Sequence, residues 1–114
     1  LPASLVFSTP QAVALLDART ALHMFATLRT PVLGMLENMS RYICPKCGHE
    51  AHIFGHGGVE LEAQKLGLPF LGSLPLDLSV RLAGDSGTPA AAGDGPMAQA
   101  YAELARGLIA SDIA

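Results

Sequence analysis

The sequence predicts an α/β fold of about three parallel strands with flanking helices. Two observations support this prediction. Short apolar runs suited to buried strands alternate with stretches of helical periodicity, and turn-forming or helix-capping residues separate them. Half of the 114 residues are hydrophobic, which is sufficient for one core but at the small end for a complete α/β enzyme. We therefore expect one domain, or one part of a domain, over residues 1–114.

The first predicted unit is a strand, a helix and a second strand. An apolar run at residues 5–8 predicts the first strand, and Thr9 and Pro10 then supply a capping residue and a residue suited to the first helical position. The helix should end before Pro31, and a second apolar run, residues 32–36, predicts a strand parallel to the first. One apolar stripe marks the core face of the helix: Leu15, Ala18, Leu22 and Phe25.

The second half of the sequence repeats this alternation. Residues 59–66 predict a short helix that Gly67 closes, and residues 69–74 predict a third strand that Pro75 ends. Residues 83–95 are rich in Gly, Ala, Asp and Pro, which indicates a mobile connection. Apolar residues between Met97 and Leu108 define a last amphipathic helix.

Composition excludes several classes of partner. The net charge of -3 and the pI near 5.7 provide no basic field, so we expect no binding to nucleic acid. No apolar run approaches the roughly 18 residues that cross a bilayer, and the first residues lack the features of a signal peptide, so we expect no membrane association. Two cysteines placed three positions apart fit a reducing compartment, which predicts a cytoplasmic protein.

The strongest local pattern lies in residues 37–58, where the helical and strand periodicity disappears. Cys44-Pro45-Lys46-Cys47-Gly48 places two thiols around a tight turn, where they can bind one metal centre, so we predict a metal-binding loop at residues 38–58. Two thiols supply only half of a four-ligand site. A symmetric dimer could bring a second pair, or ligands drawn from His49, His52 or His56 could complete a zinc site within one chain. A thioredoxin-like redox pair is a third reading, although the pair does not start a helix.

Two further loops follow the second and third predicted strands. Asn38 could present both a donor and an acceptor to a planar base, and Pro75, Leu76 and Asp77 fall on the same edge of a parallel sheet. Simpler roles exist for both, because Asn commonly closes turns and Asp commonly caps helices. The Gly-rich residues 54–58 have neither the spacing nor the Lys of a phosphate loop, so no phosphate binding is assigned to them.

The order of these motifs resembles the Mrp/ApbC family of iron-sulfur cluster carriers, relatives of the MinD-type ATPases. The similarity covers nearly the whole chain. The matching segments are Ser8-Thr9-Pro10-Gln11, Asp17-Ala18-Arg19, Met24-Phe25, Pro31-Val32-Leu33-Gly34, Glu37-Asn38-Met39-Ser40, Cys44-Pro45-Lys46-Cys47-Gly48, Ile53-Phe54-Gly55-His56-Gly57-Gly58, Leu66-Gly67-Leu68-Pro69-Phe70-Leu71-Gly72, Pro75-Leu76-Asp77 and Gly87-Thr88-Pro89.

This resemblance implies a Rossmann-like P-loop NTPase fold that works as a homodimer. It implies that Cys44 and Cys47 of two subunits hold a bridging [4Fe-4S] cluster for delivery to apo iron-sulfur proteins. It also implies an adenine-side role for Asn38 and for the loop at Pro75, Leu76 and Asp77. ATP would meet this chain only at that side.

The sequence also departs from the family pattern. The Gly-rich phosphate loop with its Lys, and the acidic motif that positions magnesium, belong to the N-terminal half of the family and are not found here. The resemblance therefore implies a partial P-loop ATPase domain, its C-terminal part, which we do not expect to hydrolyse ATP alone. Missing neighbouring strands would leave an apolar edge strand exposed unless another chain covers it.

Two alternatives remain open from the sequence. One is a small zinc-binding structural or interaction module without enzymatic activity, in which the cysteines and nearby histidines hold the loop in shape. The other is a MinD-like nucleotide-dependent module that binds a partner protein without any metal.

Overall fold

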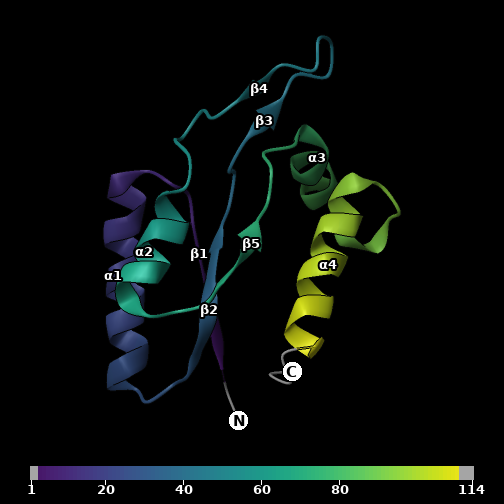
Figure 1. Cartoon of the computed structure of the whole chain (residues 1–114). Coiled ribbons are helices and arrows are strands. Elements are labelled where there is room, and N and C mark those ends of the chain that lie inside the picture. Colours follow the sequence, from purple (N-terminus) through teal and green to yellow (C-terminus); the bar gives the residue numbers. More distant parts are fainter. Residues whose placement is uncertain (1–2, 111–114) are drawn as a thin grey trace.

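The computed structural model describes residues 3–110, which form a parallel sheet with strand order β1-β2-β5 and a separate antiparallel pair, β3 and β4 (Figure 1). Helices α1 and α2 cover one face of the sheet, and α3 and α4 lie on the other side of β5. The β3–β4 hairpin projects beyond the end of the sheet. The elements are β1 (Ser4–Ser8), α1 (Ala12–Thr27), β2 (Val32–Glu37), β3 (Tyr42–Ile43), β4 (Glu50–Ala51), α2 (Gly58–Leu66), β5 (Phe70–Ser73), α3 (Leu78–Ser86), the 3-10 turn η1 (Ala90–Ala92) and α4 (Pro96–Ala110).

Strand β2 is the centre of the sheet. It pairs with β1 on one side and with β5 on the other, both in parallel, as the alternation of strands and helices predicts. Met35 and Leu36 are 0% and 1% exposed although they point to opposite faces. A strand buried on both faces fits a parallel sheet covered by crossover helices.

The core lies between the sheet and the two helices α1 and α2. Its buried members come from β1, α1, β2 and α2: Val6, Leu15, Ala18, Met35, Val59 and Ala63. The predicted stripe on α1 is confirmed, because Leu22 and Phe25 pack against the same cluster. A glycine permits the close approach of α2, since a Cβ at Gly58 would lie 2.5 Å from the carbonyl oxygen of Pro10.

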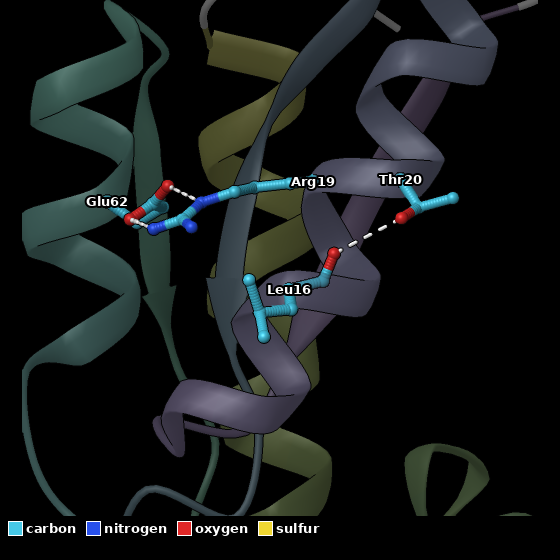
Figure 2. Close-up of polar contacts among 4 residues, drawn as sticks. All are labelled: Leu16, Arg19, Thr20 and Glu62. Carbon is cyan, nitrogen blue, oxygen red and sulfur yellow. Dashed lines mark hydrogen bonds and ion pairs between the residues drawn. The ribbon is translucent and has the colours of Figure 1, made fainter.

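A two-pronged ion pair joins the helices on this face (Figure 2). Arg19 of α1 donates from Nε to Oε1 of Glu62 at 2.5 Å and from its terminal nitrogen to Oε2 at 2.8 Å. These hydrogen bonds lower the pKa of the buried Glu62 carboxyl, against the opposing effect of burial. The same figure shows the Thr20 hydroxyl donating to the carbonyl of Leu16, one turn earlier in α1.

The predicted start of the first helix is wrong. The helix begins at Ala12, and Gln11 occupies the cap position in an extended conformation without a side-chain capping bond. Pro10 lies outside the helix because it is buried against the start of α2, next to Gly58. The Thr9 hydroxyl donates to Oε1 of Gln11 at 2.7 Å instead of accepting from a helical amide. A tertiary contact has overridden a local capping preference.

The interpretation of residues 83–95 as a connection is also wrong in part. Helix α3 extends to Ser86, where Gly87 ends it with a left-handed conformation (φ +79°), and residues 90–92 form η1. Asp77 caps α3 by accepting a hydrogen bond from the Ser79 amide at 2.8 Å, which confirms the simpler role for that residue. Helix α3 is only nine residues long, and its last four residues, 83–86, have the composition of a connection. Helical periodicity therefore did not indicate how far it extends.

The outer edge of β1 lacks a neighbouring strand in the part of the chain that the structure describes. Within residues 3–110, β1 pairs with β2 alone, so its outer edge offers unpaired backbone groups. Phe7 of this strand is 44% exposed. In the same residues, every helix falls short of the length and apolar character that crossing a membrane demands.

We predict that replacing Glu62 with Gln lowers the free energy of unfolding at neutral pH. Since Arg19 holds the pKa of Glu62 below its ordinary value, the stabilising effect of the charged form is present above the pKa of the unfolded chain and is lost as pH falls through the folded pKa. The difference between wild type and Glu62→Gln should therefore shrink on acidification below about pH 4. Urea denaturation followed by circular dichroism measures it.

The matched control is Glu60→Gln, because Glu60 lies on the same helix but is exposed. This variant should follow the wild-type pH dependence closely. A Glu62→Gln curve that runs parallel to wild type at every pH would show that the pair with Arg19 does not stabilise the fold through its charge.

Candidate metal centre

The two cysteines lie at the tip of the hairpin that follows β2. Its stem pairs Tyr42 with Ala51 and Ile43 with Glu50. An ion pair of 3.3 Å between Arg41 and Glu50 joins the two limbs. The expectation of an irregular segment at residues 37–58 is therefore wrong for the stem, because strands of two residues are too short to produce a detectable alternation.

The tip is a tight turn closed by backbone hydrogen bonds. The Gly48 amide donates to the Cys44 carbonyl at 2.9 Å, and the Cys44 amide donates to the His49 carbonyl at 2.9 Å. Gly48 has a φ of +75°, a conformation that favours glycine and accounts for its place after Cys47. Both thiols are free, Cys47 exposed and Cys44 partly so. The turn thus carries two solvent-accessible thiols on one hydrogen-bonded loop.

The turn favours the thiolate form of Cys44. The backbone amide of Cys47 and then that of Lys46 hydrogen-bond to it, with a further bond to the Cys47 side chain, and together they lower the pKa of the Cys44 thiol. The thiolate is the form that binds a metal. The donor set therefore fits a thiophilic metal centre such as zinc or an iron-sulfur cluster.

The histidines of this segment do not complete a site around the cysteines. The rings of His52 and His56 are in tilted contact, with centres 4.3 Å apart and planes at 43° to each other. The Nδ1 atom of His52 lies 3.1 Å from the carbonyl oxygen of Ser40, at the base of the hairpin. Among residues 3–110, no three His, Cys, Asp or Glu side chains gather to hold a metal. Nothing in the described chain supports the zinc site within one subunit.

The hairpin is joined directly to the loop that follows β5. The pairing of β2 with β5 continues past the sheet, since the Ser40 amide donates to the Leu74 carbonyl at 2.9 Å. The Leu76 amide donates to the Arg41 carbonyl at 2.7 Å, and Tyr42 forms a parallel bridge with Leu76. Backbone hydrogen bonds of one extended ladder therefore hold the cysteine hairpin beside the loop at residues 75–77.

A groove of about 730 Å³ lies beside this ladder, between the hairpin, β5 and α4. Pro75, Leu76 and Asp77 line it, together with Tyr42 and Pro45 of the hairpin. Most of the other lining side chains are apolar, which suits a flat, partly apolar ligand. The α4 residues that border it are Pro96, Met97, Ala100, Glu103 and Leu104.

Asn38 does not line that groove. Its amide donates to the Ser8 carbonyl at 2.8 Å, between the ends of β1 and β2, and its side-chain oxygen accepts from the Met39 amide at 3.0 Å. Met39 has a φ of +52°, so Asn38 helps to close a left-handed turn. The structure brings the residues at 75–77 together with the hairpin and leaves Asn38 at a neighbouring point on the same sheet edge.

Sequence reasoning missed one polar residue at this edge. Glu37, the last residue of β2, is buried at 2% exposure. Its carboxyl accepts hydrogen bonds from the Ser40 hydroxyl and from the Val59 amide. The signal that could have found it is an acidic residue directly following the apolar run at residues 32–36. An acidic side chain is ordinarily expected to be exposed, so its burial was not anticipated.

Comparison with known proteins identifies related sequences and one related structure. The family model described as ParA, NUBPL iron-transfer P-loop NTPase, matches residues 1–109. An iron-sulfur cluster carrier protein of Pyrococcus furiosus is 46% identical over 110 residues, which are 96% of this chain and 37% of that protein. The mouse iron-sulfur cluster transfer protein NUBPL is 49% identical over 86 residues, 75% of this chain and 27% of that protein.

A solved structure agrees with the fold. A nucleotide-binding protein of Archaeoglobus fulgidus, in complex with ADP, superposes with a TM-score of 0.61 at 32% identity, covering 73% of this chain and 34% of that one. The present chain spans about a third of the length of the curated relatives it matches. The predicted Rossmann-like P-loop NTPase fold is thus confirmed, and the chain belongs to the ParA-type family of NUBPL iron-transfer P-loop NTPases.

Proposed function

We propose that this chain is the cluster-holding part of an iron-sulfur carrier. One observation supports this most strongly: two free thiols, one of them with a lowered pKa, sit on a single exposed turn at the tip of a hairpin. A cluster bound there would be reachable by an acceptor protein. The related proteins are iron-sulfur cluster carrier and transfer proteins, which supports the same cargo.

The number of ligands calls for two chains. A [4Fe-4S] cluster takes four thiolates, and each chain supplies Cys44 and Cys47. A two-fold axis through the cluster would bring the same pair from each subunit, as in an isologous dimer. Exposed apolar side chains flank the turn, since Ile43 is 50% exposed and Ile53 is 56% exposed. A second copy that covers them would gain hydrophobic stabilisation.

We also propose that the groove at residues 75–77 takes the adenine side of a nucleotide, and that Asn38, outside the groove but on the same sheet edge, contributes to that side. Its apolar lining suits a base, and the related Archaeoglobus fulgidus structure contains ADP. Phosphate binding and ATP hydrolysis need a phosphate loop and its Lys, which this sequence does not contain. The ATPase activity is therefore a proposal for the larger family protein, and this chain alone is expected to be inactive.

Delivery to apo iron-sulfur proteins completes the proposal. The exposed position of Cys47 allows an acceptor thiolate to reach a cluster held at the tip. Free thiols fit a reducing compartment such as the cytoplasm. A nucleotide in the neighbouring groove would lie against the same ladder that supports the hairpin, because Leu76 bonds to Arg41.

We predict that anaerobic reconstitution with iron and sulfide loads the wild-type chain with about two iron atoms per chain, or about one four-iron cluster per two chains. The double variant Cys44→Ser, Cys47→Ser should retain less than about a tenth of that iron, because a serine hydroxyl is a poor substitute for a thiolate ligand. Iron counting and the brown absorption that bleaches on reduction are the measurements.

Lys46→Ala is the matched control, since it keeps both thiols and the backbone amide that bonds to Cys44. It should load like wild type. A folded wild-type chain that takes up no iron would contradict the carrier proposal. Retention of colourless zinc instead of iron would favour the structural-metal alternative.

We predict that ADP and adenosine shift the same amide resonances when each is titrated into the isotope-labelled chain. The shifts should centre on Leu76 and Asp77 and include Asn38, because the base and not the phosphates would make the contact. Binding should be weak, with a dissociation constant in the millimolar range, which corresponds to a binding free energy of about -4 kcal/mol.

Asp77→Ser tests the carboxyl without removing the helix cap, since serine also caps helices well. It should weaken ADP binding and leave α3 intact. Shifts confined to the Gly-rich residues 54–58, or shifts with ADP but none with adenosine, would contradict an adenine site in the groove.

A further inference from the structure

One buried acidic side chain has no place in the metal or nucleotide site described above. Glu37 ends β2 at the point where the chain leaves the sheet for the cysteine hairpin. The chain returns at the start of α2, Gly58. Glu37 therefore lies at the base of the loop formed by residues 38–57, which contains both cysteines. A carboxyl that is 2% exposed is destabilising unless its oxygens find partners.

The two oxygens of Glu37 bind the two limbs of this loop. Oε2 accepts from the hydroxyl of Ser40, on the outgoing limb, at 2.5 Å. Oε1 accepts from the amide of Val59, on the returning limb, at 3.3 Å. Val59 belongs to the first turn of α2, where amides lack helical partners and where the helix dipole favours an acidic group. One side chain thus closes the loop at its base.

Ser40 extends this connection across the loop. It is 3% exposed, and its carbonyl oxygen lies 3.1 Å from Nδ1 of His52 on the returning limb. Since a carbonyl only accepts, this bond places a proton on Nδ1. The Ser40 amide also donates to the Leu74 carbonyl, which attaches the outgoing limb to β5. Hydrogen bonds therefore run continuously from Val59 through Glu37 and Ser40 to His52.

We propose that Glu37 is a positioning residue for the cysteine turn. Its carboxyl fixes the angle at which the hairpin leaves the sheet, and thereby the place of Cys44 and Cys47. A small rotation at the base of a hairpin produces a larger displacement at its tip, and four thiolates from two chains must converge on one cluster. The consequence for the cluster rests on the proposed carrier function, whereas the closing of the loop can be measured without metal.

The test compares Glu37→Met with Glu37→Gln. Methionine keeps the length of the side chain and removes both acceptors, whereas glutamine can accept from the Val59 amide and donate to the Ser40 hydroxyl. Hydrogen exchange in the metal-free chain should be about tenfold faster or more in Glu37→Met at the amides of Ser40, Cys44 and Gly48. Glu37→Gln should stay close to wild type. After iron-sulfur loading, a chelator should remove iron several-fold faster from Glu37→Met.

Glu62→Gln is the matched control, because it alters another buried glutamate that joins α1 to α2 and does not contact the loop. Exchange at the hairpin amides should be unchanged in this variant. Ser40→Ala provides a second variant in case Glu37→Met does not fold, and it should loosen the same amides by a smaller factor. Unchanged hairpin exchange in both Glu37→Met and Ser40→Ala overturns the proposal, as does equal loosening in Glu62→Gln.

The outcomes also separate this inference from the carrier function. If Glu37→Met loosens the hairpin selectively while wild type takes up no iron, the carrier function fails and the closing of the loop by Glu37 stands. The positioning role fails and the carrier function stands if both wild type and Glu37→Met hold a cluster, lose it to the chelator at the same rate and show the same hydrogen exchange at the hairpin amides.

Discussion

The burial of β2 on both faces is the constraint on which the rest of the structure depends. Met35 and Leu36 are almost fully excluded from solvent, so β2 needs a helix layer on one side and apolar cover on the other. Its neighbours β1 and β5 take their register from it. Because β2 is central, the position of its last residue, Glu37, determines where the cysteine hairpin leaves the sheet. The hairpin that carries the candidate metal centre thus follows directly on the central strand of the core.

Most of the fold could be predicted from the sequence because its signals are local and repeated. The three parallel strands, the apolar face of α1 and the end of α2 at Gly67 follow from periodicity and capping, and the structure confirms them. The start of α1 could not be predicted, since the burial of Pro10 against Gly58 is a contact between distant segments. Helix α3 could not be delimited, since it is only nine residues long, has no buried residue and ends in residues typical of a connection.

The candidate site could be predicted from the sequence only in part. The spacing of Cys44 and Cys47 is a strong pattern, and the structure places both thiols on one turn. The binding roles of Asn38 and of residues 75–77 stay predictions, and the structure places Asn38 outside the groove that the other three line. Glu37 escaped prediction because its importance comes from two partners on opposite limbs of a loop, which no single stretch of sequence reveals.

The arrangement also connects the two proposed binding regions. The ladder from Glu37 to Tyr42 against Leu74 and Leu76 makes the hairpin stem and the groove loop parts of one hydrogen-bonded unit. A ligand that shifted the groove loop would therefore act on the stem of the cysteine hairpin through backbone bonds. This physical connection is compatible with a carrier in which nucleotide binding at one place affects cluster holding at another.

The most direct test of the central claim, that two chains share one cluster through Cys44 and Cys47, is native mass spectrometry of the anaerobically reconstituted protein. The account predicts a species with the mass of two chains plus one [4Fe-4S] cluster, which falls apart into single chains when the cluster is removed. A single chain that holds its metal alone, or a pair of chains that persists unchanged in the Cys44→Ser, Cys47→Ser variant without any cluster, would contradict it.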